Sequence, residues 1–180
     1  MNIAPTAIVS KNIRVRYEDR FTIGDYSVID DFCYFSTLVN VNKFAHIAAN
    51  CTVAGGRDST FYLGNFSCLA SGVRLYCSSD DFTNDLATVL PEWCTDVKNH
   101  LVAGDVCLND YVTIGANTVV MPGNNVPEGT VIGAMSFVPR NYEFKPWSVY
   151  AGCPRLRLIG QRNKSNVLDQ AREVLRRKEI

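Results

Sequence analysis

Residues 102–138 read VAGDVCLNDYVTIGANTVVMPGNNVPEGTVIGAMSFV. A bulky aliphatic residue stands at every sixth position of this stretch: Val102, Leu108, Ile114, Val120, Val126, Ile132 and Val138. A smaller side chain follows most of them after four positions, as Val106, Val112, Thr118, Thr130 and Ser136, while Asn124 departs from the pattern. A period of six fits neither an α-helix nor a plain alternating strand. It indicates a chain that turns sharply after every few extended residues.

Two earlier runs have the same period. One comprises Ile23, Ile29, Phe35, Val41, Ile47 and Val53, and the other comprises Leu63, Leu69 and Leu75. Three such sides close a triangular coil of 18 residues, with the bulky side chain inside and the small one beneath a corner. The sixteen bulky positions predict a little over five coils. We therefore expect an all-β solenoid of hexapeptide repeats.

Two interruptions break the repeat. The first, from Ala54 to Tyr62, adds four residues to the period, and the second, from Tyr76 to Leu101, is an excursion of 26 residues. An insert of that length in a compact domain is usually functional. After Ser165, apolar residues at helical spacing lead to a basic end that is typical of a helix C-terminus. We expect a repeat domain over 1–162, with the insert loop at 76–101, and a C-terminal α-helix over 163–180.

Composition argues against several classes of protein. The 180 residues carry 18 acidic and 18 basic side chains, which does not suit a nucleic-acid binder driven by bulk charge. There is no secretion-signal pattern near the start and no apolar stretch long enough to span a bilayer. The seven cysteines form no CxxC pair, and their odd number argues against a closed disulfide set. We expect a cytoplasmic protein.

The end of the repeat resembles the hexapeptide-repeat acyltransferases. The residues that carry this resemblance are Ile114–Gly123, Ile132–Val138 and the following segment Pro146–Pro154. The family implies a left-handed parallel β-helix, a homotrimer, and acetyl-CoA or another acyl-CoA as co-substrate, with no metal. The resemblance covers about residues 20–162.

A further stretch indicates one branch of the family. Residues 66–82 read FSCLASGVRLYCSSDDF, which is similar to the enzymes that acylate nucleotide-linked 4-amino-4,6-dideoxysugars, such as the anthrose and viosamine N-acyltransferases. The resemblance implies N-acylation, with acetyl as the expected group, of a nucleotide-sugar acceptor for surface polysaccharide or O-antigen biosynthesis. O-acetylation of a galactoside or other glycan and a non-catalytic β-helix scaffold stay open as alternatives. A γ-class carbonic anhydrase needs three histidines for its zinc, whereas this chain has two.

The two consecutive aspartates of that stretch are the first candidates for catalysis. In related branches a histidine follows the segment equivalent to Leu75–Tyr76 and acts as general base, whereas this chain has Ser79–Asp81 there. A sugar amine is a good nucleophile, so a carboxylate that orients it and balances its positive charge is sufficient. By the family's motif we assign this role to Asp81, with the backbone N–H near Ser71 as the oxyanion donor. Without the resemblance, such a pair indicates a solvated turn or cap.

The two histidines lead to different expectations. His46 ends a hexad at an outer corner, where it could act as base or activate a hydroxyl, although a surface imidazole at a trimer interface explains it equally well. His100 stands where the chain re-enters the repeat and is expected to be structural. The candidates for contacting the sugar nucleotide are Asp80, Tyr76 and Phe82. Aromatic side chains of an insert more often pack it against the body, and this applies also to Trp93.

The cofactor site is expected to consist of backbone more than of side chains. Pantetheine is an amide chain that exposed N–H and C=O groups can hold in the manner of a sheet. The family's corners for this contact correspond to Gly115, Ala116, Gly133 and Ala134. The geometry of the repeat also favours small residues at these positions.

The phosphates of CoA are assigned to a segment near the end of the repeat. Where the family has Gly-x-Pro-Ala-Lys, this chain has Gly152–Leu156, so a leucine stands at the position of the lysine. We assign the cofactor contact to Pro154 and Arg155, with Arg157 as an alternative cation, because arginine binds phosphate at least as well as lysine.

Overall fold

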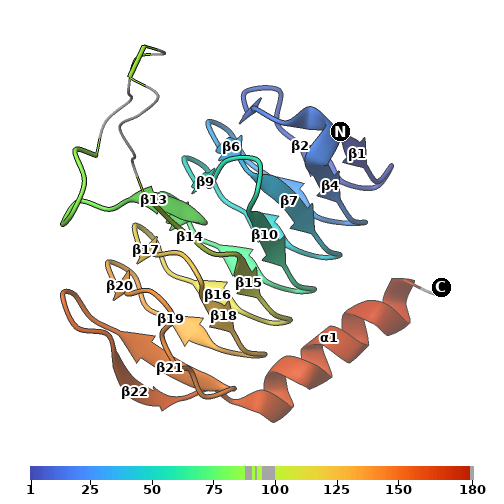
Figure 1. The fold of residues 1–180 in the computed structure, drawn as a ribbon. Helices are drawn as coiled ribbons and strands as arrows, with labels where there is room; N and C mark the ends of the chain where they lie inside the picture. Colours follow the sequence, from blue (N-terminus) through green and yellow to red (C-terminus); the bar gives the residue numbers. More distant parts are fainter. Residues whose placement is uncertain (88–90, 92, 95–99, 179–180) are drawn as a thin grey trace.

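The computed structural model describes residues 1–87, 91, 93–94 and 100–178. The chain winds into a three-sided parallel β-helix, each side of which is one parallel sheet (Figure 1). The predicted β-helix of hexapeptide repeats, with a long insert and a C-terminal helix, is confirmed. No described helix is both long and apolar enough to cross a membrane.

We name the three sides sheets A, B and C. Sheet A consists of β1 (Asn2–Ile3), β4 (Phe21–Ile23), β7 (Leu38–Val41), β10 (Thr60–Leu63), β15 (Val106–Leu108) and β18 (Asn125–Val126). Sheet B consists of β2 (Ile8–Val9), β5 (Val28–Ile29), β8 (His46–Ile47), β11 (Cys68–Leu69), β16 (Thr113–Ile114), β19 (Val131–Ile132), β21 (Ser148–Ala151) and the antiparallel β22 (Arg157–Gln161). Sheet C consists of β3 (Arg14–Val15), β6 (Tyr34–Ser36), β9 (Thr52–Ala54), β12 (Arg74–Tyr76), β17 (Val119–Val120) and β20 (Phe137–Val138).

These strands form six complete coils, numbered from the N-terminus, and β21 begins a seventh. The six-residue pattern predicted a little over five, because it missed the coil made by β1, β2 and β3. A 3₁₀ helix, η1 (Glu18–Arg20), follows that coil and shifts the phase of the repeat before Ile23. The first coil therefore has the same fold as the others but lies out of register with them in sequence.

The interior of the β-helix holds the predicted bulky residues. From Ile23 to Val138 they are almost completely buried, with the exception of Val102. The small side chains beneath the corners bind the backbone of the next coil: Ser67 Oγ donates to the carbonyl of Asn109 at 2.8 Å, and Thr118 Oγ1 donates to that of Gly133 at 2.9 Å. Asn124, which departs from the pattern, donates to the carbonyls of Met121 and Pro139. Each buried polar group thus replaces its lost hydration with a hydrogen bond.

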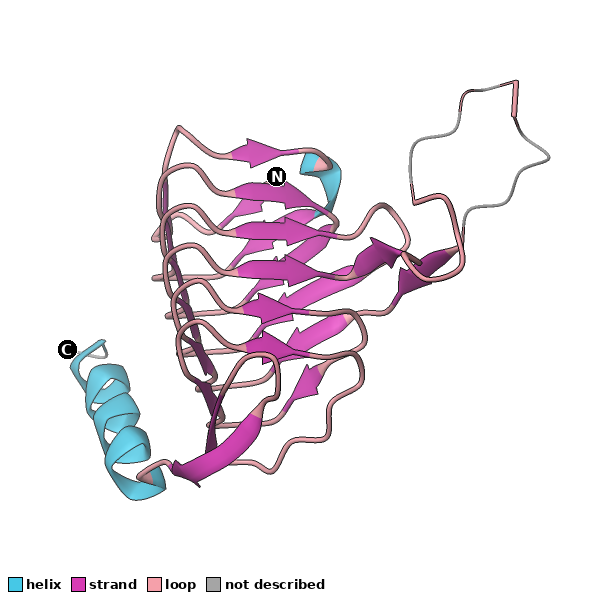
Figure 2. Cartoon of the chain, turned by 90° about the vertical axis from the view of Figure 1, so that its left-hand side faces the viewer, coloured by secondary structure: helices cyan, strands magenta, loops and turns pink. Residues whose placement is uncertain are grey.

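The corner between sheets A and B carries a column of aromatic rings that the sequence pattern did not reveal. Tyr26, Phe44, Phe66 and Tyr111 stack on successive coils with ring centroids 4.7–5.6 Å apart, and Trp147 continues the column at 5.9 Å from Tyr111. All five have a positive φ near 60°. Helix α1 (Lys164–Lys178) runs alongside this corner (Figures 1 and 2). The column therefore forms the surface on which the C-terminal helix lies.

The long insert leaves the β-helix through a short hairpin. Strands β13 (Ser78–Asp80) and β14 (Leu101–Ala103) pair antiparallel and project from the coils (Figure 2). Val102 lies in this hairpin opposite Ser79, so the prediction that it starts the last run of coil positions is wrong. The repeat resumes at β15. His100 Nδ1 lies 3.1 Å from the Asp85 carboxylate at the base of the insert, as expected for a structural histidine.

Candidate active site

Asp81 directly follows the hairpin strand β13. Its Oδ1 accepts from the backbone N–H groups of Thr83 at 3.0 Å and Asn84 at 3.2 Å, and its Oδ2 accepts from the side-chain amide of Asn84 at 2.7 Å. The hydrogen bonds from Asn84 and Thr83 hold the pKa of the Asp81 carboxyl below its usual value. Asp81 is therefore a carboxylate that caps the first turn of the insert. A carboxylate with a lowered pKa is suited to balancing positive charge and is a weak proton acceptor.

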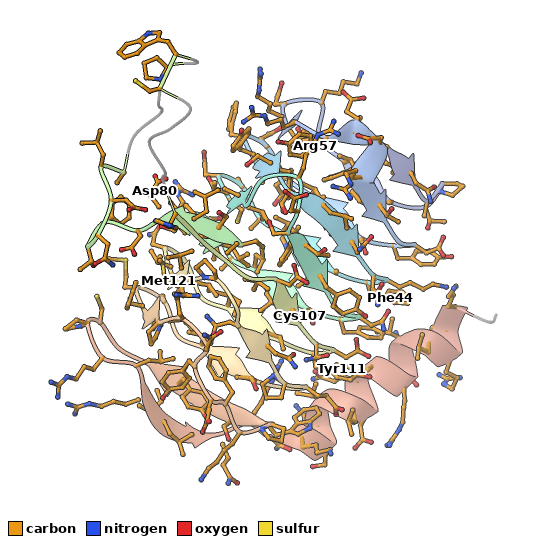
Figure 3. All side chains as sticks on the ribbon, in the orientation of Figure 1. Phe44, Arg57, Asp80, Cys107, Tyr111 and Met121 are labelled. Carbon is orange, nitrogen blue, oxygen red and sulfur yellow. The ribbon has the colours of Figure 1, made fainter. Side chains whose placement is uncertain are left out.

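The three predicted substrate residues lie close to Asp81 in the chain. Asp80 ends β13 and is half-buried (Figure 3), and Tyr76 ends β12 on the outer face of sheet C. Phe82 is 76% exposed and Trp93 is 82% exposed. In the single chain, these two aromatic side chains do not pack against the body, which was the alternative for the aromatic residues of the insert. Their exposed faces are free to contact a ligand or a second chain.

His46 lies on the outer face of sheet B. Its Nε2 is 2.9 Å from Oδ2 of Asp30, which belongs to the preceding coil, and both side chains are partly exposed. A carboxylate in this position fixes the orientation of the imidazole. Cys68 is the strand neighbour of His46, and burial raises the pKa of its thiol, so it is not an activated nucleophile. The pair of His46 and Asp30 can accept a proton at the surface.

Ser71 belongs to a column of small residues along the corner between sheets B and C. The carbonyl of Ser71 accepts from the amide of Asn117 at 3.1 Å, and that of Ala116 accepts from the amide of Met135 at 2.8 Å. Ser71, Ala116 and Ala134 therefore occupy equivalent places on coils 4, 5 and 6. Within the part of the chain that the structure describes, their own amide N–H groups find no acceptor. This corner therefore offers a row of N–H donors on successive coils, about 4.8 Å apart.

The glycines beside this row are needed by the repeat itself. A Cβ added to Gly115 would collide with the backbone of Gly133 and Ala134 on the next coil, and one added to Gly133 would lie 3.1 Å from Cβ of Ala151. Steric fit between coils accounts for both glycines, as the geometry of the repeat suggested. Ala116 and Ala134 differ from them, because they lie at the turn itself and leave their amides open.

Pro154 and Arg155 lie at the end of the same corner. They line a shallow pocket with Gly152, Cys153 and Arg157. Arg155 and Arg157 are exposed, whereas Leu156 between them is buried at the end of the core. The leucine at the position of the family's lysine therefore supports the fold, and the two exposed guanidinium groups remain available for phosphate.

The single chain does not bring all of these residues together. Ser71 lies at the corner where the coil-4 strand of sheet C begins, and Asp81 lies beyond its end. Strands β12 and β13 run between them, which corresponds to roughly 20 Å of extended chain. The predicted residues thus form two groups, with Ser71 and the cofactor corner on one edge and Tyr76, Asp80, Asp81 and Phe82 on the other.

Comparisons with known proteins show which enzymes the chain resembles. No protein-family model matches the chain. Over 151 residues it is 28% identical to a dTDP-4-amino-4,6-dideoxy-D-glucose acyltransferase of Escherichia coli, which covers 81% of this chain and 74% of that protein. It is also 29% identical to a putative lipopolysaccharide biosynthesis O-acetyl transferase of the same species, with 78% and 68% covered.

Solved structures of an N-acyltransferase are also similar to the chain. AntD, an N-acyltransferase from Bacillus cereus in complex with dTDP and 3-hydroxybutyryl-CoA, is 27% identical, with a TM-score of 0.85 over 99% of this chain and 92% of that chain. A variant of AntD in complex with dTDP-4-amino-4,6-dideoxyglucose and coenzyme A matches with a TM-score of 0.84 over 97% and 90%. The likeness spans nearly the whole chain.

Proposed function

Because the chain belongs to the hexapeptide-repeat acyltransferases, we propose that it transfers an acyl group from acyl-CoA to the amine of a nucleotide-linked 4-amino-4,6-dideoxyhexose. The main support is the near-complete match to an N-acyltransferase solved with such a sugar and coenzyme A. The variants solved for that enzyme include substitutions of a serine and of an aspartate ten residues further along. Ser71 and Asp81 have the same spacing here.

Asp81 orients the acceptor amine in this reaction. The neutral amine attacks the thioester carbonyl, the C–N bond forms, and the intermediate carries a positive nitrogen and a negative oxygen. The anionic Asp81 accepts a hydrogen bond from the amine and balances the positive charge as it develops. Asp80, Tyr76 and Phe82 contact the sugar nucleotide from the same edge. Collapse of the intermediate breaks the C–S bond, and the nitrogen proton passes to the departing CoA sulfur, so that the products are the amide and CoA as a free thiol.

The free amide of Ser71 supplies the opposite interaction. It donates to the oxyanion of the intermediate. In comparable sites one preorganised N–H stabilises the transition state by about 3 kcal/mol. The amides of Ala116 and Ala134 continue the same row and hold the amide groups of pantetheine. Gly115 and Gly133 keep that row flat, and Pro154 and Arg155 receive the adenosine phosphates at its end.

The active unit is a homotrimer, with each site lying between two chains. The support for this is the separation of Ser71 from Asp81, because a second copy is needed to place the insert edge of one chain against the Ser71 edge of the next. The outer face of sheet C carries half-buried apolar side chains, namely Tyr34, Tyr76, Val119, Met121 and Phe137, and a second chain could cover them. Light scattering on active protein is the direct test, and an active species near 20 kDa would exclude the trimer.

The setting of the reaction is the cytoplasmic supply of activated sugars for surface polysaccharide. All seven cysteines are unpaired in the structure, including the exposed Cys153, as is usual in a reducing compartment. The related lipopolysaccharide protein supports the polysaccharide context.

One panel of assays tests the acceptor and the chemistry together. Purified protein is incubated with acetyl-CoA and, in parallel, with a dTDP-linked 4-amino sugar, its 4-hydroxy counterpart and a galactoside, and free thiol release is followed. Turnover with the amine and none with the alcohols supports N-acylation. Calorimetry with acetyl-CoA separates an enzyme from a scaffold, because absence of binding at millimolar ligand contradicts acyltransferase activity.

O-acetylation is the second candidate, and the 2.9 Å pairing of His46 with Asp30 is the observation that favours it. A hydroxyl, unlike an amine, needs a base to remove its proton during attack. Release of thiol with the galactoside, lost in His46→Ala, would establish this alternative.

A further inference from the structure

The irregular turns of the β-helix gather at one corner. Between sheets C and A, η1 joins coils 1 and 2, residues 55–59 join coils 3 and 4, and the long insert joins coils 4 and 5. The corners between sheets A and B and between sheets B and C keep the spacing of the repeat throughout the complete coils. Insertions in a repeat protein often mark the binding face. The proposed reaction gives no role to η1 or to residues 55–59, although the sequence shows the second of these as an interruption.

A basic and aromatic cluster lies at this corner. The guanidinium carbons of Arg57 and Arg16 are 5.1 and 5.7 Å from the ring centroid of Tyr17. Arg20 donates a hydrogen bond to the carbonyl of Arg57 and so ties the 55–59 loop to η1. The cluster therefore joins segments that are some forty residues apart in the chain.

Among the residues that the structure describes, the two guanidinium groups have no carboxylate partner. Glu18, Asp19 and Asp58 belong to the same two segments, yet no described carboxylate lies within ion-pair distance of Arg16 or Arg57. The face of Tyr17 offsets part of the repulsion between the two cations. Both guanidinium groups are exposed beside one ring, and each can bind phosphate oxygens through paired N–H donors.

The loop that carries Arg57 also reaches the base of the insert. The amide of Cys77 donates to the carbonyl of Ala54 at 2.6 Å, and the amide of Thr60 donates to Oδ1 of Asp105 at 2.8 Å. The amide of Gly56 donates to the carbonyl of Ser36 at 2.7 Å. Hydrogen bonds thus connect η1, the loop and the hairpin of Asp80 along one edge, on which Figure 3 labels Arg57 and Asp80. Three strand spacings, about 14 Å, separate the level of Tyr17 from that of Asp81.

We infer that Arg16 and Arg57, held on Tyr17, bind the diphosphate of the sugar-nucleotide acceptor while its amine reaches Asp81. This assignment rests on the proposed function, since that supplies the acceptor. Both substrates carry a diphosphate, because CoA has one as well. The position of the cluster favours the acceptor: Arg155, assigned to CoA, lies at the opposite end of the β-helix, beyond coil 6 and at a different corner.

Calorimetric titration of the full chain tests the assignment. The ligands are dTDP, thymidine, inorganic pyrophosphate and CoA, and the proteins are wild type, Arg16→Ala, Arg57→Ala, Arg57→Lys and the control Arg140→Ala. Arg140 is an exposed arginine at the same corner, but it follows coil 6. We expect Arg16→Ala and Arg57→Ala to weaken dTDP binding about 10- to 100-fold, because each removes charged hydrogen bonds. Binding of CoA and of thymidine should be the same in all variants, and the control Arg140→Ala should bind dTDP as wild type does. Arg57→Lys should recover part of the dTDP affinity that Arg57→Ala loses.

The outcomes separate this assignment from the proposed function. Wild type that does not bind dTDP, or variants that bind it as wild type does, would overturn the diphosphate site. If these variants instead weaken CoA binding, the cluster serves the donor and the assignment to the acceptor is wrong. Normal N-acylation with an unchanged KM in Arg57→Ala would refute the site and leave the function intact. Arginine-dependent dTDP binding without any N-acylation would support the site and refute the function.

Discussion

The indole of Trp147 lies against the backbone of Gly129, where a Cβ added to the glycine would collide with three ring carbons. Gly129 has φ +70° and stands on the aromatic column in the coil between Tyr111 and Trp147. Its missing side chain gives Trp147 room to approach Tyr111 across that coil. The column can therefore continue into the seventh coil, and Lys164 of helix α1 lies 5.1 Å from the Trp147 ring.

Gly129→Ala should destabilise the protein. The substitution places a side chain at positive φ and in the space of the indole, and together these cost roughly 2–4 kcal/mol. For a chain of this size the thermal midpoint should fall by roughly 5–15 °C. Two control variants, measured at the same protein concentration, separate the cost of the positive φ from the cost of the collision with the indole. Gly56 has φ +78° and open space around it, so Gly56→Ala should lower the free energy of unfolding by only about 1 kcal/mol. Gly160 has neither a positive φ nor a close neighbour, so Gly160→Ala should change the stability little. Equal midpoints for all three variants would contradict the packing argument.

Ala171→Glu should detach helix α1 from the aromatic column. Ala171 is the helix residue buried against Phe66 and Tyr111, with which it lines a small pocket. A buried carboxylate with no partner is costly, so undocking of the helix is the expected response. Limited proteolysis should then cleave the chain near residue 162 much faster than in wild type. Asn166→Glu places the same charge on an exposed first turn, where it is favourable, and should leave the cleavage rate unchanged.

The sequence predicted the coils well because one residue in six must fill the narrow interior. It did not reveal the aromatic column, since a six-residue search averages over three different corners. Each corner recurs only after a full coil, as Tyr26 and Phe44 do at a spacing of 18 residues. A search at that period would have found Tyr111, Gly129 and Trp147 as well. The first coil was missed for a similar reason, because η1 changes the phase.

The candidate site was predictable only in pieces. Ser71, Ala116 and Ala134 could be assigned individually from the motif, and the structure places them in one column. Asp81 could be chosen from the motif as well, but its local role as a cap depends on Thr83 and Asn84, which no motif marks. In the proposed trimer the relation between the two edges depends on a second chain, and a sequence pattern within one chain carries no information on it.

Asp81→Asn should keep the fold and lose catalysis. The amide can still cap the turn at Thr83, but it no longer balances a positively charged amine. We expect kcat to fall about 10²- to 10⁴-fold with a small change in KM, because the interaction is strongest in the transition state. Asp85→Asn is a control for the structure of the insert, since Asp85 binds His100 and has no proposed contact with substrate. A turnover near that of wild type in Asp81→Asn would remove Asp81 from the reaction.

The pH dependence of kcat then distinguishes Asp81 from His46. The pKa of Asp81 is lowered, so its carboxylate stays ionised to a lower pH than an ordinary aspartate and loses its charge only as the pH falls further. Between about pH 5 and 8 an acidic limb must therefore come from another group, either His46 or the amine of the substrate. If Asp81 alone assists the amine, His46→Ala should retain most of the activity and the limb should remain, because it belongs to the substrate. A general base at His46 predicts the opposite: His46→Ala loses about as much as Asp81→Asn, and the limb disappears. Asp30→Asn provides the matched variant, because it removes the carboxylate that contacts His46 and should lower turnover only if His46 is the base.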